Sequence, residues 1–136
     1  MTRAISLDTE QLHGLLPLAA TLGIRLSHAQ PNEVLLEMDW REELCTAGGV
    51  LHGGALMSLA DTAGGVCAYL NLAPEGEGTT TIESKTNLLA AVRGGTVTAK
   101  ATPLHVGSRL IVVETELRSG DRLVAKTIQT QAVLRG

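Results

Sequence analysis

Positions 52–61 of the chain read His52-Gly53-Gly54-Ala55-Leu56-Met57-Ser58-Leu59-Ala60-Asp61. Two glycines stand at the start of an apolar stretch with helical spacing, and a single carboxylate follows two turns later. Glycine leaves backbone N–H groups unshielded, and the first N–H groups of a helix lack intrahelical partners and favour negative charge. An aspartate that faces the core of an apolar helix is costly without a partner or a role. The stretch therefore predicts an oxyanion site and a desolvated carboxylate, two groups that acyl transfer requires.

The apolar stretch continues to about position 72 and predicts the one long helix of the chain. Small side chains occur nearly all round it, at Ala55, Ser58, Ala63, Gly64, Gly65 and Ala68. A helix of this composition is expected to be buried on most sides and closely approached by backbone or by another helix. We therefore predict a central helix over residues 53–72.

The remaining segments predict strands and one short amphipathic helix. Residues 8–22 carry Asp8 and Gln11 at the spacing of a capping box, with Pro17 as a point where the helix kinks or breaks. Alternating apolar residues and turn residues predict strands over 23–29, 34–40, 79–89, 96–106, 109–117 and 122–134. Helices do not alternate with strands, so we expect an α+β fold with an antiparallel sheet. One domain over residues 1–136 is expected, with residues 1–22 as an N-terminal helical segment.

Composition and charge exclude several classes of protein. The net charge of −3 and the pI near 5.8 provide no basic field for nucleic acid. No apolar run reaches the roughly 18 residues that a membrane span needs. The first residues lead into a polar segment and not into a signal-peptide core. We therefore expect a cytoplasmic globular protein with no nucleic-acid or membrane partner.

The cysteine and aromatic residues further limit the chemistry. Cys45 and Cys67 are too few and too far apart for a metal site, and no His, Cys or Asp spacing suggests one. Cys67 is predicted to be a small buried hydrophobe, whereas Cys45 lies beside a glycine-rich loop where a reactive thiol is the alternative. The chain has no Phe, so a pocket that stacks its ligand on a ring must use Trp40 or Tyr69. We predict no metal and no cofactor.

The spacing within the central helix has a consequence for assembly. Eight residues separate Gly53 from Asp61, which is about 12 Å along a helix. A nucleophile or general base must lie within about 3–3.5 Å of the reacting atom. Asp61 therefore cannot act on a carbonyl held by Gly53 of its own helix, but Asp61 of a second helix packed alongside in the opposed direction can. This predicts a homodimer with two composite sites.

The central part of the chain resembles the hotdog-fold acyl-CoA thioesterases, in particular their phenylacetate-degradation (PaaI-like) branch. The resemblance runs from Gly49 to His52-Gly53-Gly54 and continues through Ser58-Leu59-Ala60-Asp61-Thr62-Ala63. The expected strand order extends this resemblance over nearly the whole chain. It implies a curved antiparallel sheet wrapped around the central helix, and a dimer that often pairs again into a homotetramer. The family usually has an Asn six residues before the motif His, where this chain has Thr46. Thr46 either takes over the polar contact of that Asn or leaves it to water.

The resemblance and the residue chemistry together assign candidate roles. Asp61 is expected to be a general base toward water or a nucleophile, and the Gly53 N–H to be the oxyanion donor. His52 is expected to orient the loop or to touch the thioester, and a packing histidine that holds the start of the helix is the alternative. Thr81 aligns with a family hydroxyl that helps to place water, and a sheet-pairing threonine is the alternative.

Contacts to the substrate and the identity of the reaction complete the prediction. Gly54, Arg93 and Arg109 are candidates for binding CoA, since Arg pairs well with phosphate oxygens, and solvated surface arginines are the alternative. The predicted reaction is hydrolysis of an acyl-CoA thioester, with phenylacetyl-CoA or hydroxyphenylacetyl-CoA favoured over aliphatic chains. A hotdog dehydratase or hydratase is one alternative, although no Pro follows His52 and Asp61 has no evident His partner. A non-catalytic acyl-CoA binding protein is the other, and it would need no carboxylate near a thioester.

Overall fold

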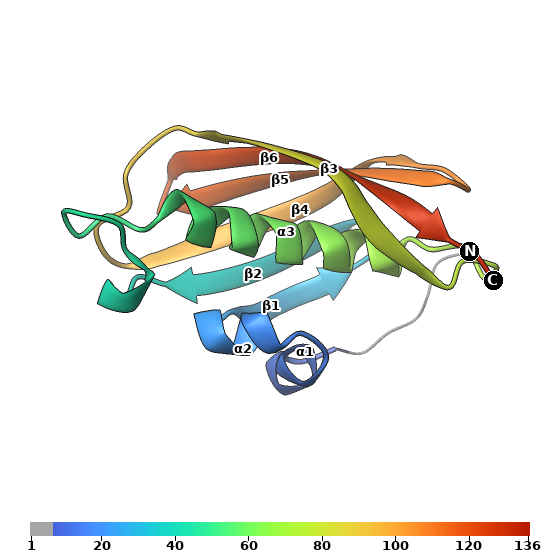
Figure 1. Cartoon of the computed structure of the whole chain (residues 1–136), viewed down its shortest axis with the longest axis horizontal. Helices are drawn as coiled ribbons and strands as arrows, with labels where there is room; N and C mark the ends of the chain where they lie inside the picture. The colour runs from blue at the N-terminus through green and yellow to red at the C-terminus, as the bar shows by residue number, and fades with distance from the viewer. Residues whose placement is uncertain (1–6) are drawn as a thin grey trace.

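The computed structural model describes residues 7–136, and Figure 1 shows the arrangement of their helices and strands. The elements are α1 (Thr9–Leu15), α2 (Pro17–Leu22), β1 (Arg25–Gln30), β2 (Glu33–Asp39), the 3-10 helix η1 (Glu42–Leu44), α3 (Gly53–Leu70), β3 (Gly78–Leu88), β4 (Thr96–Val106), β5 (Leu110–Ser119) and β6 (Arg122–Leu134).

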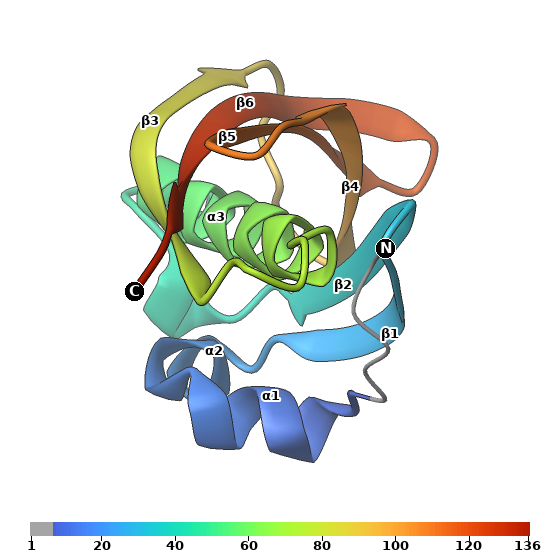
Figure 2. The same ribbon diagram turned by 90° about the vertical axis from the view of Figure 1, so that its right-hand side faces the viewer.

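The described strands form one antiparallel six-stranded sheet in the order β1-β2-β4-β5-β6-β3. Figure 2 looks along α3 and shows the strands curving around it, with α1 and α2 beside β1. The edges of the curved sheet are β1 and β3, and the side of α3 between them is not covered by a strand. This arrangement is the hotdog fold, so the predicted fold class is confirmed.

Residues 1–6 of the predicted N-terminal helical segment lie outside the described residues, and the rest of the segment forms two helices. The Asp8 side chain accepts a hydrogen bond from the Gln11 N–H, and the Gln11 side chain accepts one from the Asp8 N–H, which is the predicted capping box. Pro17 is the first residue of α2, a position where its missing N–H costs nothing. The predicted break at Pro17 is therefore confirmed.

The strand predictions hold with small shifts at the ends. The strands predicted over 96–106 and 122–134 match the bounds of β4 and β6. β1 begins at Arg25 and not at position 23, because Gly23 adopts φ 68° and ends α2 with a left-handed cap. On β2, the predicted inward row of Val34, Leu36 and Met38 is fully buried.

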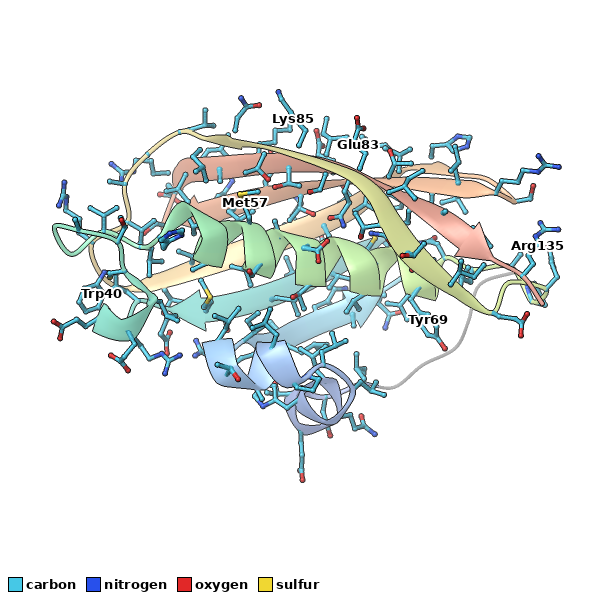
Figure 3. The ribbon with its side chains drawn as sticks, in the orientation of Figure 1. Trp40, Met57, Tyr69, Glu83, Lys85 and Arg135 are labelled. Carbon is cyan, nitrogen blue, oxygen red and sulfur yellow. The ribbon has the colours of Figure 1, made fainter. Side chains whose placement is uncertain are left out.

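The central helix is buried on one side only. Nine of its residues are buried against the sheet, but Asp61 lies with Met57 and Tyr69 on its exposed face. The prediction that most sides of the helix are buried, and that Asp61 faces the core as a desolvated carboxylate, was therefore wrong for the single chain. The reason is that the sheet leaves one side of α3 open, and Figure 3 shows Met57 near the start and Tyr69 near the end of the helix.

None of the described helices is long and apolar enough to cross a membrane.

The core consists of aliphatic and alanine side chains from α3 and the inner face of the sheet. Small residues such as Ala99 and Ala101 let the helix approach the sheet closely.

The buried thiol of Cys67 leads to a labelling prediction. Cys67 is fully buried on α3, as predicted, and burial raises the pKa of its thiol to about 12. Because the thiolate is the reactive form, Cys67 is expected to be inert in the folded protein, while half-buried Cys45 reacts slowly. An aromatic disulfide reagent should release one thiol equivalent from native protein and two after denaturation. Two equivalents at equal rates from native protein would contradict this.

Candidate active site

The start of α3 is fixed by the side chain of His52. His52 is the N-cap residue, and its Nδ1 atom accepts a hydrogen bond of 2.8 Å from the Gly54 N–H. Nδ1 must therefore carry no proton, since the amide is the donor. The Gly53 N–H, by contrast, has no hydrogen-bond acceptor among the described residues. Gly53 thus presents the free amide donor at this helix terminus.

A glycine-rich loop leads into this terminus. Gly48 and Gly49 both adopt positive φ, and the Thr46 N–H donates to the Val50 carbonyl, which closes the loop on itself. Thr46 is exposed on the loop, and Arg93 Nη1 donates to the Gly48 carbonyl at 3.3 Å. The structure therefore collects Thr46, His52, Gly53 and Arg93 at one end of α3.

A second group of polar side chains surrounds Asp61. Its Oδ1 atom accepts hydrogen bonds from Thr81 Oγ1 at 3.3 Å and from Gln129 Nε2 at 3.1 Å. Gln131 Nε2 in turn donates to Thr81 Oγ1. The other carboxylate oxygen, Oδ2, has no hydrogen-bond partner among residues 7–136. One oxygen of Asp61 is therefore anchored and the other is available to a substrate or a water.

Neighbouring strands deliver these partners to the helix. Thr81 on β3 is paired with Gln131 on β6. Gln129 precedes Gln131 by two residues and therefore lies on the same face of β6. Gln129 and Gln131 are buried, whereas Asp61 and Thr81 are exposed in the single chain. The network thus runs from the core of the sheet to the open side of α3.

A cavity of about 780 Å³ opens beside Asp61 on the open side of α3. Asp61, Thr81 and Gln131 form a polar part of its lining, and Asp61 is the one charged side chain among the lining residues. The apolar part comes from α1, α2 and α3, and includes Leu12, Leu15, Leu16, Leu18, Val66 and Tyr69. Tyr69 is thus the aromatic residue placed at this cavity.

Gln129 and Gln131 were not predicted from the sequence. The period of the last strand could have indicated them. Thr127, Gln129 and Gln131 occupy alternate positions, which places all three on the face of the strand that points to the core. An amide on the inner face of a strand needs a buried partner. Two such amides two residues apart therefore indicate a polar network at the central helix.

The predicted site residues thus fall into separate groups within one chain. Asp61 and Thr81 meet, but Thr46, His52, Gly53, Gly54 and Arg93 lie at the start of α3, about 12 Å along the helix from Asp61. Arg109 lies at the β4–β5 hairpin, at the opposite end of the molecule in Figure 1. Arg122 donates to the Ala91 carbonyl and adds a cation near Arg93 that was not predicted from the sequence.

Comparison with known proteins identifies the family. The family model described as the thioesterase superfamily matches residues 48–126, more than half of the chain. This chain belongs to the thioesterase superfamily. An esterase candidate from Saccharolobus solfataricus is 35% identical over 116 residues, which cover 84% of this chain and 81% of that protein.

Other relatives of this thioesterase agree with the assignment. A solved thioesterase structure from Haemophilus influenzae has a TM-score of 0.89 and 28% identity, covering 99% of this chain and 96% of that one. A 1,4-dihydroxy-2-naphthoyl-CoA hydrolase from Listeria monocytogenes is 29% identical over 100 residues, covering 74% of this chain and 80% of that protein. The chain is therefore a thioester hydrolase with the hotdog fold.

Proposed function

We propose that this thioesterase hydrolyses an acyl-CoA thioester to the free acid and CoA. The observation that carries the proposal is the position of Asp61, a carboxylate with one free oxygen at an otherwise uncharged cavity. The thioester carbonyl would lie at Asp61, and the acyl group would extend along the apolar lining. No histidine hydrogen-bonds to Asp61 among the described residues, so a hydratase that pairs His with an acid gains no support.

Hydrolysis proceeds in this proposal by one of two routes at Asp61. As a general base, the carboxylate takes a proton from water, and the resulting hydroxide attacks the thioester carbon. As a nucleophile, its free oxygen attacks directly and forms a mixed anhydride, which water then cleaves. In both routes the carbonyl oxygen becomes an oxyanion, its collapse breaks the C–S bond, and CoA leaves as a thiolate. The thiolate takes up a proton, from Asp61 in the base route or from water in the nucleophile route, to give the CoA thiol. Thr81 donates a hydrogen bond to Asp61 and lines the same cavity, so its hydroxyl can help to place the water.

The oxyanion donor in this proposal is the Gly53 N–H of the partner subunit. Gly53 and Asp61 belong to one continuous helix and are about 12 Å apart along it, so one chain cannot supply both groups to one carbonyl. Opposed packing of two α3 helices along their exposed faces brings the two groups together twice. A backbone N–H at a helix terminus then stabilises the developing charge.

Exposed surfaces support a homodimer as the minimal active unit. On the open face of α3, a Cβ at Gly65 would meet no atom within 4 Å among residues 7–136 other than its chain neighbours and the backbone of its own helix, so a second helix could approach closely. The edge strand β3 pairs with β6 on one side and carries exposed Ile82 and Leu88. An unpaired edge with apolar side chains is a typical surface for association. We expect two such dimers to pair further into a homotetramer.

The CoA moiety is proposed to bind near the start of α3. Arg93 and the Gly54 backbone lie there in the same chain. Arg109 lies at the opposite end, and in a dimer with opposed helices this end of one chain falls near the start of the partner's helix. Arg109 would therefore serve the site to which the partner subunit contributes the helix terminus.

The cavity supports an uncharged acyl group of moderate size. Its volume of about 780 Å³ and aliphatic lining fit an aromatic acyl group or a medium aliphatic chain. Tyr69 offers a ring next to such a group. A relative named for an aromatic CoA thioester, 1,4-dihydroxy-2-naphthoyl-CoA, supports the aryl choice. We therefore favour phenylacetyl-CoA or hydroxyphenylacetyl-CoA, the substrate class of the PaaI-like branch.

A hydrolysis panel tests this proposal. Phenylacetyl-, hydroxyphenylacetyl-, benzoyl- and straight-chain acyl-CoA thioesters of four to twelve carbons are compared by following release of the CoA thiol. The highest kcat/KM is expected for phenylacetyl-CoA or hydroxyphenylacetyl-CoA. Preference for an aliphatic chain would contradict the aryl assignment, and binding of every ester without turnover would instead favour a binding protein.

A further inference from the structure

Gln129 is a fully buried side chain that points from β6 to the central helix. Its Nε2 atom donates to Asp61 Oδ1 at 3.1 Å, whereas the second donor, Thr81, is exposed and lies at 3.3 Å. Asp61 itself stands on the open face of α3. The shorter of its two hydrogen bonds therefore comes from the buried donor.

The amide of Gln129 occupies a slot in α3 that Gly64 creates. A Cβ atom at Gly64 would lie 1.8 Å from Gln129 Oε1 and 2.4 Å from its Cδ, so any larger residue at this position would displace the amide. Glycine in the middle of a helix is less favourable than alanine. Its presence in α3 is explained by the close approach of the Gln129 side chain.

The geometry also fixes which way the amide points. The opposite orientation would place Oε1 against Asp61 Oδ1, and two acceptors repel when the carboxylate is ionised. In the observed orientation Oε1 is buried with no hydrogen-bond partner among the described residues. A buried unpaired acceptor destabilises a fold, so packing alone does not explain a glutamine here.

From these contacts we propose that Gln129, seated in the slot at Gly64, is a positioning residue for Asp61. Its hydrogen bond holds Oδ1 and so directs Oδ2 toward the cavity, where water or the acyl carbon is bound. This inference rests on the proposed function of Asp61. It assigns no chemical step to Gln129, which touches the carboxylate and not the substrate.

The first test replaces Gln129 with Met, which has a similar length and no amide. The expected result is a fall in kcat of about 10- to 100-fold, since small misplacements of a reacting group have effects of this size. KM should change by less than about twofold, and Tm should stay equal or rise because the unpaired acceptor is gone. A kcat within twofold of wild type, or a kcat loss that only accompanies a lower Tm, would overturn the proposal.

Thr115→Val is the matched control. Thr115 Oγ1 is the other buried side-chain atom that lacks a partner among the described residues, and it lies on β5 and makes no hydrogen bond to Asp61. Removing it should leave Tm equal or higher, as at Gln129, but kcat should remain at the wild-type value. An equal loss of kcat in this variant would assign the effect to the core and not to Asp61.

A double-mutant cycle tests the slot. Gly64→Ala should lower kcat at least tenfold in the wild-type background, because the new Cβ displaces the amide. In the Gln129→Ala background the same change should have almost no further effect. Equal losses in both backgrounds would show that Gly64 acts independently of Gln129 and would overturn the proposal.

A measurement without substrate separates this inference from the proposed function. Three-bond NMR couplings at the Asp61 side chain should report one χ1 rotamer in wild type and rotamer averaging in Gln129→Met. Unchanged couplings would overturn the positioning role even if the enzyme is active. Absence of acyl-CoA turnover by wild-type protein would instead overturn the proposed function, whatever the couplings show.

Discussion

Replacing Asp61 with Asn is expected to lower kcat for CoA thioesters by about 10²–10⁴-fold, the usual contribution of a general base. Asn has the same shape and keeps an amide oxygen that can accept the hydrogen bonds from Thr81 and Gln129. It lacks the charge needed to deprotonate water or attack a carbonyl. The rate is measured by thiol release, and Tm by calorimetry.

Because Asp61 is exposed in the single chain, the substitution should leave the fold intact. Asp121→Asn, on the exposed β5–β6 turn, provides the control for a change of charge. Its kcat should equal that of wild type. Near-wild-type hydrolysis by Asp61→Asn would remove Asp61 from the mechanism.

Replacing Gly53 with Pro is expected to lower kcat by about 10²–10³-fold, the cost of one lost oxyanion donor. Gly53 is the first residue of α3, where Pro is well tolerated. His52 before it has φ −61° and ψ 135°, which is the backbone that a residue preceding Pro adopts. The substitution therefore removes the N–H while the helix can still form.

Gly53→Ala is the matched variant for this experiment. A Cβ at position 53 lies 2.6 Å from Leu88 Cδ1, so both variants must move the tip of the same exposed leucine. Ala keeps the N–H and Pro does not. A much larger kcat loss for Pro than for Ala is expected, and equal losses would point to the leucine contact and not to the donor.

Mixing the inactive variants tests whether the site is shared between subunits. After exchange of subunits between Asp61→Asn and Gly53→Pro dimers, half of the dimers carry one of each chain. In a composite arrangement each mixed dimer has one intact site, so activity should recover to about a quarter of wild type. Recovery would fail if each chain supplied both groups to its own site.

Local sequence signals predicted the elements well, and for local reasons. The Asp8–Gln11 capping box and the break at Pro17 involve residues close in sequence, and β4 and β6 carry continuous strand patterns between turn residues. The same signals correctly placed Cys67 in the core. These features depend on backbone preference and side-chain period, which a single sequence contains.

The surroundings of Asp61 could not be predicted in the same way. They consist of contacts between residues far apart in the sequence, which the period of a helix or strand does not reveal. Small residues all round α3 indicated close approach, but they did not tell whether the neighbour belongs to the same chain. In the structure, the sheet covers one side of the helix and leaves the other side open. Gln129 reaches Asp61 across 68 positions of sequence, and its slot depends on a glycine that looked like one small residue among several.

The loop before α3 is hydrogen-bonded to a natural fluorophore, the indole of Trp40. Trp40 is the single tryptophan of the chain, and its indole Nε1–H donates to the Gly49 carbonyl at 3.0 Å. Gly49 adopts positive φ three residues before His52, so the indole is joined to the segment that presents the helix terminus. Indole emission responds to the polarity and motion around the ring. The unlabelled protein therefore contains its own fluorescent reporter at the end of α3 where the Gly53 amide is exposed.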